Sequence, residues 1–292
     1  MNANNKIWTE IGNLTEKLKK LNLTDSIDYT KYYIYSIITH STAIEGSTLT
    51  EAETQLLFDE GIAAPKPLVQ NLMNLDLKNA YDFAATQAAK KTVITPEFLK
   101  TLSALILKST GGVMSTVAGT FDTSKGDYRL CSVQAGPGGK SYMNYQKVPD
   151  SVTALCAALD EKIDKPVSLE AIYNLSFDAH LNLVTIHPWA DGNGRTARLL
   201  MNYIQFYRGL VPTKIHQEDR AGYITSLRTS QDSQDNTPFR EFMALQHAKT
   251  LKEEIAHYSK NQKKRDNPYV LNSDFNCSPR KTTPFKYSRL TN

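Results

Sequence analysis

The sequence is poor in cysteine and in long apolar runs, and both shortages exclude classes of protein. Its three cysteines, Cys131, Cys156 and Cys277, are odd in number and widely spaced among 292 residues. This pattern argues against a disulfide framework and against a zinc cluster. No apolar run approaches the roughly 20 residues that span a bilayer, and the first ten residues lack the apolar core of a secretory signal. We therefore expect a cytoplasmic protein with no membrane partner.

The net charge is unevenly distributed along the chain, and most of it lies in the last 34 residues. The total is +4, but residues 259–292 contribute eight basic and two acidic side chains. The remaining 258 residues carry 26 basic and 28 acidic side chains, so the folded part is near neutral. Beyond about residue 257 the sequence is polar and aperiodic, which is typical of a solvated, flexible tail. Nucleic-acid binding by this basic tail is the less favoured interpretation.

Helical periodicity dominates the sequence. Thr50-Glu51-Ala52-Glu53 has the pattern of a capping box at the start of a helix, and Gly46 suits the end of the helix before it. Apolar spacing predicts helices over residues 27–45, 68–90, 96–108, 151–160, 168–185, 196–207 and 237–257. One region differs: residues 128–133 are strand-like and are followed by a glycine-rich turn and Ser141-Tyr142-Met143. We expect a short β-hairpin there, in an otherwise α-helical protein.

The residues with the clearest chemistry lie in one stretch, His187-Pro188-Trp189-Ala190-Asp191-Gly192-Asn193-Gly194-Arg195-Thr196-Ala197-Arg198. A glycine-rich loop that leads into a helix presents N–H groups and a positive dipole to an anion. Arg195 and Arg198 lie on one side of the first helical turn, and guanidinium groups bind phosphate oxygens in pairs. Two arginines at a helix N-terminus oppose the dipole, so an anionic ligand would explain them.

The same stretch also supplies a metal ligand and a base. Asp191 is a hard oxygen ligand of the kind that a phosphate-bound Mg²⁺ uses. His187 has an ordinary pKa near neutrality and can deprotonate a hydroxyl. A plain turn with solvated arginines is the alternative, which the convergence of four phosphate-handling features disfavours. The other histidines (His40, His180, His216, His247 and His257) show no metal-ligand spacing, and the sequence has no Walker-type loop.

This stretch resembles the signature of the Fic (Fido) family, His-x-Phe-x-(Asp/Glu)-Gly-Asn-Gly-Arg-x-x-Arg, at every position but one. Trp189 stands where phenylalanine is usual. The resemblance implies that His187 is the base, Asp191 the Mg²⁺ ligand and Gly192, Asn193 and Gly194 the anion-binding loop. It also implies that Arg195 and Arg198 bind the phosphates of ATP. Doc-type kinases of the family have lysine at the position of Gly194, so glycine favours transfer of AMP.

Other segments resemble parts of the same family. Ala179-His180, Arg220-Ala221-Gly222-Tyr223 and Pro238-Phe239 are similar to its flanking helices. The predicted hairpin takes the place of its flap, so that Tyr128, Arg129 and Val133 are expected to dock the target peptide. Ser41-Thr42-Ala43-Ile44-Glu45-Gly46 is similar to its inhibitory motif, which implies a Glu45–Arg198 pair that blocks ATP. An ordinary helix end at Glu45 is the alternative.

Together these patterns predict a mainly α-helical protein in three parts. An N-terminal helical lobe spans residues 1–95, a Fic core spans 96–248, and a helix end with a basic tail spans 249–292. The expected activity is AMP transfer from Mg·ATP to a Ser, Thr or Tyr hydroxyl of a protein partner or of the chain itself. Removal of AMP by the same site and a non-catalytic nucleotide-sensing module are the alternatives. Fic proteins with this inhibitory motif often self-associate, so a homo-oligomer is also expected.

Overall fold

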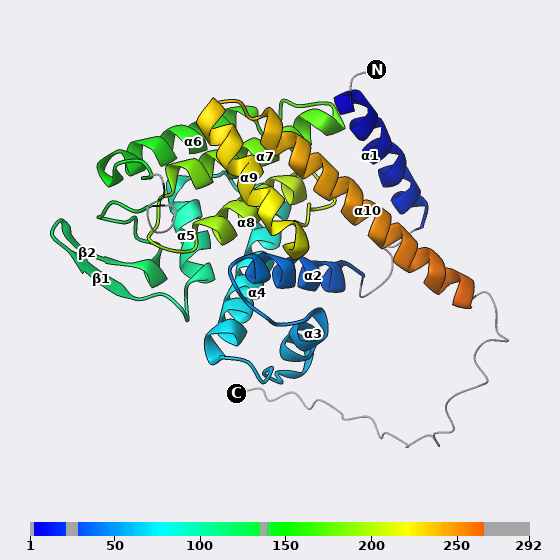
Figure 1. Cartoon of the computed structure of the whole chain (residues 1–292), viewed down its shortest axis with the longest axis horizontal. Helices are drawn as coiled ribbons and strands as arrows, with labels where there is room; N and C mark the ends of the chain where they lie inside the picture. Colours follow the sequence, from blue (N-terminus) through cyan, green and yellow to red (C-terminus); the bar gives the residue numbers. More distant parts are fainter. Residues whose placement is uncertain (1–2, 22–28, 135–138, 140, 266–292) are drawn as a thin grey trace, which may run out of the picture.

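A computed structural model describes residues 3–21, 29–134, 139 and 141–265 (Figure 1). Helices make up most of this part of the chain, and the described residues form one small antiparallel sheet. The helices are α1 (Ala3–Lys20), α2 (Tyr29–Ile44), α3 (Glu51–Glu60), α4 (Leu68–Ala89), α5 (Pro96–Ile106), α6 (Val148–Lys162), α7 (Leu169–Ile186), α8 (Asn193–Tyr207), α9 (Arg220–Ser233) and α10 (Thr237–Arg265). The strands are β1 (Val113–Thr116) and β2 (Gly119–Asp122). The mainly α-helical fold class is thus confirmed.

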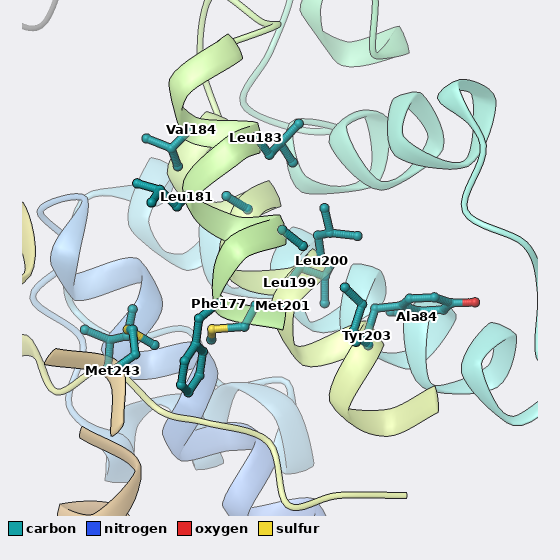
Figure 2. Close-up of a cluster of buried hydrophobic side chains, with 14 of the residues drawn as sticks. Ala84, Phe177, Leu181, Leu183, Val184, Leu199, Leu200, Met201, Tyr203 and Met243 are labelled. Atoms are coloured by element: carbon teal, nitrogen blue, oxygen red, sulfur yellow. The ribbon is translucent and has the colours of Figure 1, made fainter. Parts of the chain in front are cut away.

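Helices α7 and α8 form the centre of the molecule. Both have buried residues around most of their circumference, so they are covered on all sides rather than on one face. Figure 2 shows Phe177 and Leu181 of α7 beside Leu199 and Met201 of α8, with Met243 of α10 nearby. This cluster extends to α1, α2, α4, α5 and α6. The short connection between α7 and α8 is therefore held on a rigid base.

The N-terminal helix packs against the C-terminal one. Trp8, Ile11 and Leu18 of α1 are buried in the same cluster as Leu251 and Ile255 of α10. Figure 1 shows α1 lying along α10, apart from α3 at the other side of the molecule. The sequence expectation of one N-terminal lobe therefore needs a qualification: α1 joins α10, whereas α2, α3 and α4 pack together beside α8.

Most predicted helices are confirmed, with bounds shifted by a few residues. The capping box at Thr50 is present, because its side chain accepts from the Glu53 N–H and the Glu53 carboxylate accepts from the Thr50 N–H. Gly46 follows α2 in a left-handed conformation, with φ +100°. Helix α10 continues to Arg265, past the predicted end at residue 257. Helix α1 was not predicted, although its apolar residues recur at helical spacing.

The hairpin predicted over residues 128–143 is present as a short antiparallel pairing. Gln134 and Ser141 form an antiparallel bridge, and Tyr142 N donates to Val133 O at 3.0 Å. The predicted turn at residues 135–138 and 140 lies outside the described residues. The strand pair β1–β2 lies earlier in the chain. The Arg129 guanidinium is fully buried and donates to the carbonyls of His187, Cys131 and Met143, and the Arg129 N–H donates to Pro188 O at 3.0 Å. These bonds tie Arg129 to the α7–α8 connection. No helix in the described part is long and apolar enough to cross a membrane.

Candidate active site

His187 ends α7 in a left-handed conformation that its neighbours enforce. Its φ and ψ are 53° and 63°, a region that non-glycine residues rarely occupy. Arg129 Nε donates to His187 O at 2.8 Å, which holds this turn in place. The imidazole stacks on Tyr142, with ring centroids 3.7 Å apart and planes 15° from parallel. Burial lowers the pKa of His187 to about 4, so that the imidazole is neutral at pH 7.

The loop between His187 and α8 is locked by two side chains. Asn193 Oδ1 accepts from Trp189 N at 3.0 Å, and Asn193 Nδ2 donates to Trp189 O at 2.8 Å. The Trp189 indole is fully buried, and its Nε1 donates to Gly126 O at 3.0 Å. Tryptophan therefore retains the anchoring role expected of the aromatic position and adds a hydrogen bond that phenylalanine lacks. Asn193 stiffens the loop with its side chain, which leaves only its backbone N–H for an anion.

The N-terminus of α8 carries a buried arginine with unpaired donors. Arg195 is 3% exposed, and within the described structure its Nε and Nη1 are buried without a hydrogen-bond partner. Its Nη2 lies 3.3 Å from Asp191 Oδ2. Burial lowers the pKa of the Arg195 guanidinium, because a buried cation without full pairing is unfavourable. A phosphate can accept hydrogen bonds from unpaired N–H groups beside the first turn of a helix.

Asp191 stands at the solvent side of this loop. Its side chain is 71% exposed, and Oδ1 accepts from Gly192 N at 2.6 Å. Gly192 has φ +79°, a left-handed conformation that favours glycine, and it directly precedes the first turn of α8. An exposed carboxylate beside unpaired phosphate donors matches the way Mg²⁺ binds in nucleotide sites, through one or two carboxylates and substrate phosphates. The residues present therefore fit a magnesium ion at Asp191.

Arg198 is completely enclosed and its donors are taken by other residues. Its Nη2 donates to Glu45 Oε1 at 2.6 Å and to Ser41 O at 3.0 Å, and Nε donates to Ser41 Oγ at 2.8 Å. Nη1 reaches Tyr223 Oη at 3.4 Å. Burial opposes the charged form of Glu45, but the Arg198 guanidinium outweighs it and holds the Glu45 pKa below its ordinary value. The structure thus places the C-terminal end of α2 directly against the α8 arginine.

Gly194 permits this contact. A Cβ atom at residue 194 would lie 2.6 Å from Glu45 Oε1 and 3.0 Å from Arg198 Nη1. Any larger residue would have to displace the Glu45 carboxylate. Glycine at this position therefore leaves room for the Glu45 carboxylate beside the first turn of α8.

The structure brings the signature residues together, and among the predicted flap residues it places Arg129 in the interior. Arg129 is buried beneath the loop and positions His187, so it does not face a target protein. Tyr128 packs its ring 6.1 Å from that of Trp189, and Val133 remains partly accessible. Sequence reasoning missed the contacts of Ser41, Tyr142 and Tyr223. Ser41 and Tyr223 lie within two segments that resemble the family, residues 41–46 and 220–223. Their hydroxyl groups, which can bond a guanidinium, are the sequence signal that could have indicated these contacts.

Residues 93–205, which include this loop, match the model of the Fic/DOC family. They form a Fic/DOC family domain. A protein adenylyltransferase Fic from Nematostella vectensis is 30% identical over 209 residues, which are 71% of this chain and 45% of that protein. One from Aedes aegypti is 31% identical over 212 residues, 71% of this chain and 39% of that protein. The chain thus spans less than half the length of these curated relatives.

Solved structures of Fic proteins have the same fold. A Fic-domain-containing signalling protein from Bacteroides thetaiotaomicron aligns with a TM-score of 0.67 and 23% identity, over 88% of this chain and 96% of its own. A fragment of Fic-1 from Caenorhabditis elegans aligns with a TM-score of 0.68 and 22% identity, over 89% of this chain and 73% of its own. The Fic fold therefore extends beyond the matched residues to most of the chain.

Proposed function

We propose that this chain transfers AMP from ATP to a hydroxyl of a protein substrate, and that Glu45 inhibits the transfer. The observation that carries the proposal is the buried Arg195, whose unpaired donors lie at the N-terminus of α8 within the loop that follows His187. An anion bound there would accept hydrogen bonds from these donors and complete the pairing of the guanidinium. The names of the relatives, protein adenylyltransferase Fic, support ATP as the source of that anion.

In the proposed reaction, His187 accepts the proton of a Ser, Thr or Tyr hydroxyl. The hydroxyl oxygen forms a bond to the α-phosphorus of ATP, and the bond from that phosphorus to the pyrophosphate oxygen breaks. A neutral imidazole is ready to take a proton at pH 7. Arg195 and the N–H groups of the first turn of α8 bind phosphate oxygens and stabilise the charge that develops. Asp191 would hold Mg²⁺, which neutralises phosphate charge when bound.

Inhibition follows from competition for one guanidinium group. Arg198 has four acceptors, and Glu45 is the only charged one among those described. A phosphate that approaches Gly194 would meet the Glu45 carboxylate, and two anions cannot share that space. Ser41 lies on α2 as well, so a small displacement of the end of α2 would free the arginine from both residues.

The decisive experiment uses ATP labelled at the α-phosphate, Mg²⁺ and a cell lysate as the source of substrate. Glu45→Gly should attach label covalently, wild type should attach little, and Glu45→Gly/His187→Ala should attach none. Glu60→Gly, an exposed glutamate at the end of α3, is the matched control and should behave as wild type. Transfer from γ-labelled ATP instead would indicate a kinase. Release of AMP from a modified protein by the wild type would favour the hydrolase.

A further inference from the structure

Two histidines that are far apart in the sequence meet beside α2. The rings of His40 on α2 and His216, which precedes α9, have centroids 5.4 Å apart. One ring nitrogen from each and a carboxylate oxygen of Glu218 lie within 4.8 Å of one another. Together with Glu253 of α10, these residues line one cleft. The cluster lies outside the loop that carries the signature, and nothing in the proposed reaction uses it.

One tautomer of His216 leaves a ring nitrogen for a metal ion. The His216 side chain is 2% exposed, and its Nε2 lies 3.0 Å from Thr250 Oγ1. In the tautomer in which Nε2 donates to this hydroxyl, the Thr250 hydroxyl donates to Gln246 O at 3.0 Å. The lone pair of Nδ1 then faces carboxylate oxygens of Glu218 and Glu253, each 3.6 Å away. A cation between these three atoms would pair with all of them.

His40 has the same tautomer. Its Nδ1 accepts from Gln217 N at 3.0 Å, so the proton is on Nε2, which faces Glu51 Oε1 at 3.4 Å. A metal-bound histidine usually directs the N–H of its other ring nitrogen to a carboxylate, as His40 does toward Glu51. A cation at Nδ1 would take the place of the Gln217 N–H. Both histidines thus present Nδ1 as the nitrogen able to bind.

The surrounding charge also suits a divalent ion. Four carboxylates and two ammonium groups surround the two rings, which leaves a local charge of −2. The carboxylates are those of Glu51, Glu218, Asp219 and Glu253, and the ammonium groups are those of Lys214 and Lys249. A dication would bring the cluster to neutrality.

We propose that His40, His216 and Glu218 form a binding site for a divalent transition metal ion, with Glu253 as a further carboxylate. Zn²⁺ binds imidazole nitrogen and carboxylate oxygen at about 2.0–2.2 Å, so tetrahedral ligand atoms stand roughly 3.4 Å apart. The separation of 3.6 Å between His216 Nδ1 and Glu218 Oε1 is close to that value. Imidazole ligands favour Zn²⁺ over Mg²⁺, which prefers oxygen alone. The site is therefore distinct in chemistry from the one at Asp191.

The location links the metal to the inhibitory contact, a consequence that rests on the proposed function. His40 directly precedes Ser41, which accepts two hydrogen bonds from Arg198. A metal ion would join α2 to the segment before α9, where Arg220 Nε already donates to Ile44 O at 2.8 Å. Cross-linking these segments holds the end of α2 in place. Bound metal should therefore lower AMP transfer by the wild type and leave Glu45→Gly unaffected.

The first test is calorimetric titration of the chelator-treated, tag-free full chain with Zn²⁺. We expect one equivalent to bind, with millimolar Mg²⁺ present. His40→Gln and Glu218→Gln should each weaken binding at least about 10-fold, since even indirect partners of a metal have effects of that size. Glu241→Gln, an exposed glutamate on the same helix as Glu253, and Cys131→Ser should not change it.

Thermal unfolding provides a second measurement that does not depend on catalysis. Zn²⁺ should raise the Tm of the wild type and of His187→Ala equally, and should raise that of Glu218→Gln less. Absence of Zn²⁺ binding, or binding that is unchanged in both His40→Gln and Glu218→Gln, would overturn the site. If His187→Ala binds Zn²⁺ but no variant transfers AMP, the site stands and the proposed function fails.

Discussion

Replacing Glu45 should make the protein less stable and more active at once. Glu45→Gly removes the 2.6 Å ion pair with the 3% exposed Arg198, but leaves three acceptors around the guanidinium: Ser41 Oγ, Ser41 O and Tyr223 Oη. Residue 45 lies beyond the last residue of α2, so glycine costs little helical stability there. Glu45→Gln keeps the shape of the side chain and removes only its charge, which makes it the matched comparison.

The size of the stability loss follows from burial. A hydrogen bond to a charged group contributes about 1.5–3 kcal/mol, and an exposed ion pair about 0.2–1 kcal/mol. The Glu45 side chain is 36% exposed, so the solvent screens part of the interaction. We expect Glu45→Gly to lower the free energy of unfolding by about 1–2 kcal/mol, or the Tm by about 2–5 °C.

The pH dependence has a definite sign. The Glu45 pKa is lower in the folded protein than its ordinary value of 4.5, so the contribution of the pair is fully present above that value. It is lost as pH falls through the lowered pKa. The Tm difference between wild type and Glu45→Gln should therefore stay constant from pH 8 to pH 5 and close only below pH 4.5.

Two assays on the same samples test whether the Glu45–Arg198 pair both stabilises the protein and inhibits transfer. Differential scanning calorimetry measures the Tm, and covalent incorporation of α-label measures transfer. A Tm that falls as expected without any gain in labelling would show that the pair is structural and that the inhibition is misassigned. An unchanged Tm would refute the energetic reasoning itself.

Three further predictions concern the loop around His187. The His187 pKa of about 4 predicts that its Cε1 proton resonance shows no titration midpoint between pH 5.5 and 8 in the nucleotide-free protein; a midpoint near 6.5 would contradict burial as the cause. Trp189→Phe restores the usual residue of the family signature but leaves Gly126 O without its donor. Trp189→Phe should therefore lower the free energy of unfolding, measured by urea denaturation, by about 1–3 kcal/mol. An unchanged urea midpoint would be evidence against the hydrogen bond from Trp189 Nε1 to Gly126 O. Gly126→Ala should lower the yield of folded protein and the Tm, because its Cβ would collide with the backbone carbonyl of Lys100 at φ +76°; Gly112→Ala, which meets nothing, is the control.

The helices were predictable because their signals are local. Apolar spacing located α4, α5, α7 and α10, and the capping box at Thr50 marked the start of α3 correctly. The same spacing in α1 was overlooked, although Ile7, Trp8, Ile11, Leu14 and Leu18 show it. The strand-like residues 128–133 lead into a short antiparallel pairing of Gln134 with Ser141. The contact of Arg129 with the α7–α8 connection depends on tertiary packing, so β propensity gave no sign of it.

The candidate site was predictable only as far as its chemistry lies in one stretch. The signature placed His187, Asp191 and both arginines, and the Glu45–Arg198 pair that the resemblance implied is present as a contact. The stacking of Tyr142 on His187 and the meeting of His40 with His216 depend on how distant segments pack. Spacing along the chain contains no information on such contacts, so these pairs could not be found before the fold was known.

The enclosure of Arg198 means that the matched family region is not self-sufficient. Residues 93–205 end within α8 and include neither Ser41 nor Tyr223, which share this guanidinium. A fragment cut to those limits would remove every described hydrogen-bond partner of the Arg198 guanidinium and would uncover the apolar faces that α1, α2 and α10 protect. Removal of α1, α2 or α10 should therefore destabilise the fold of the matched region.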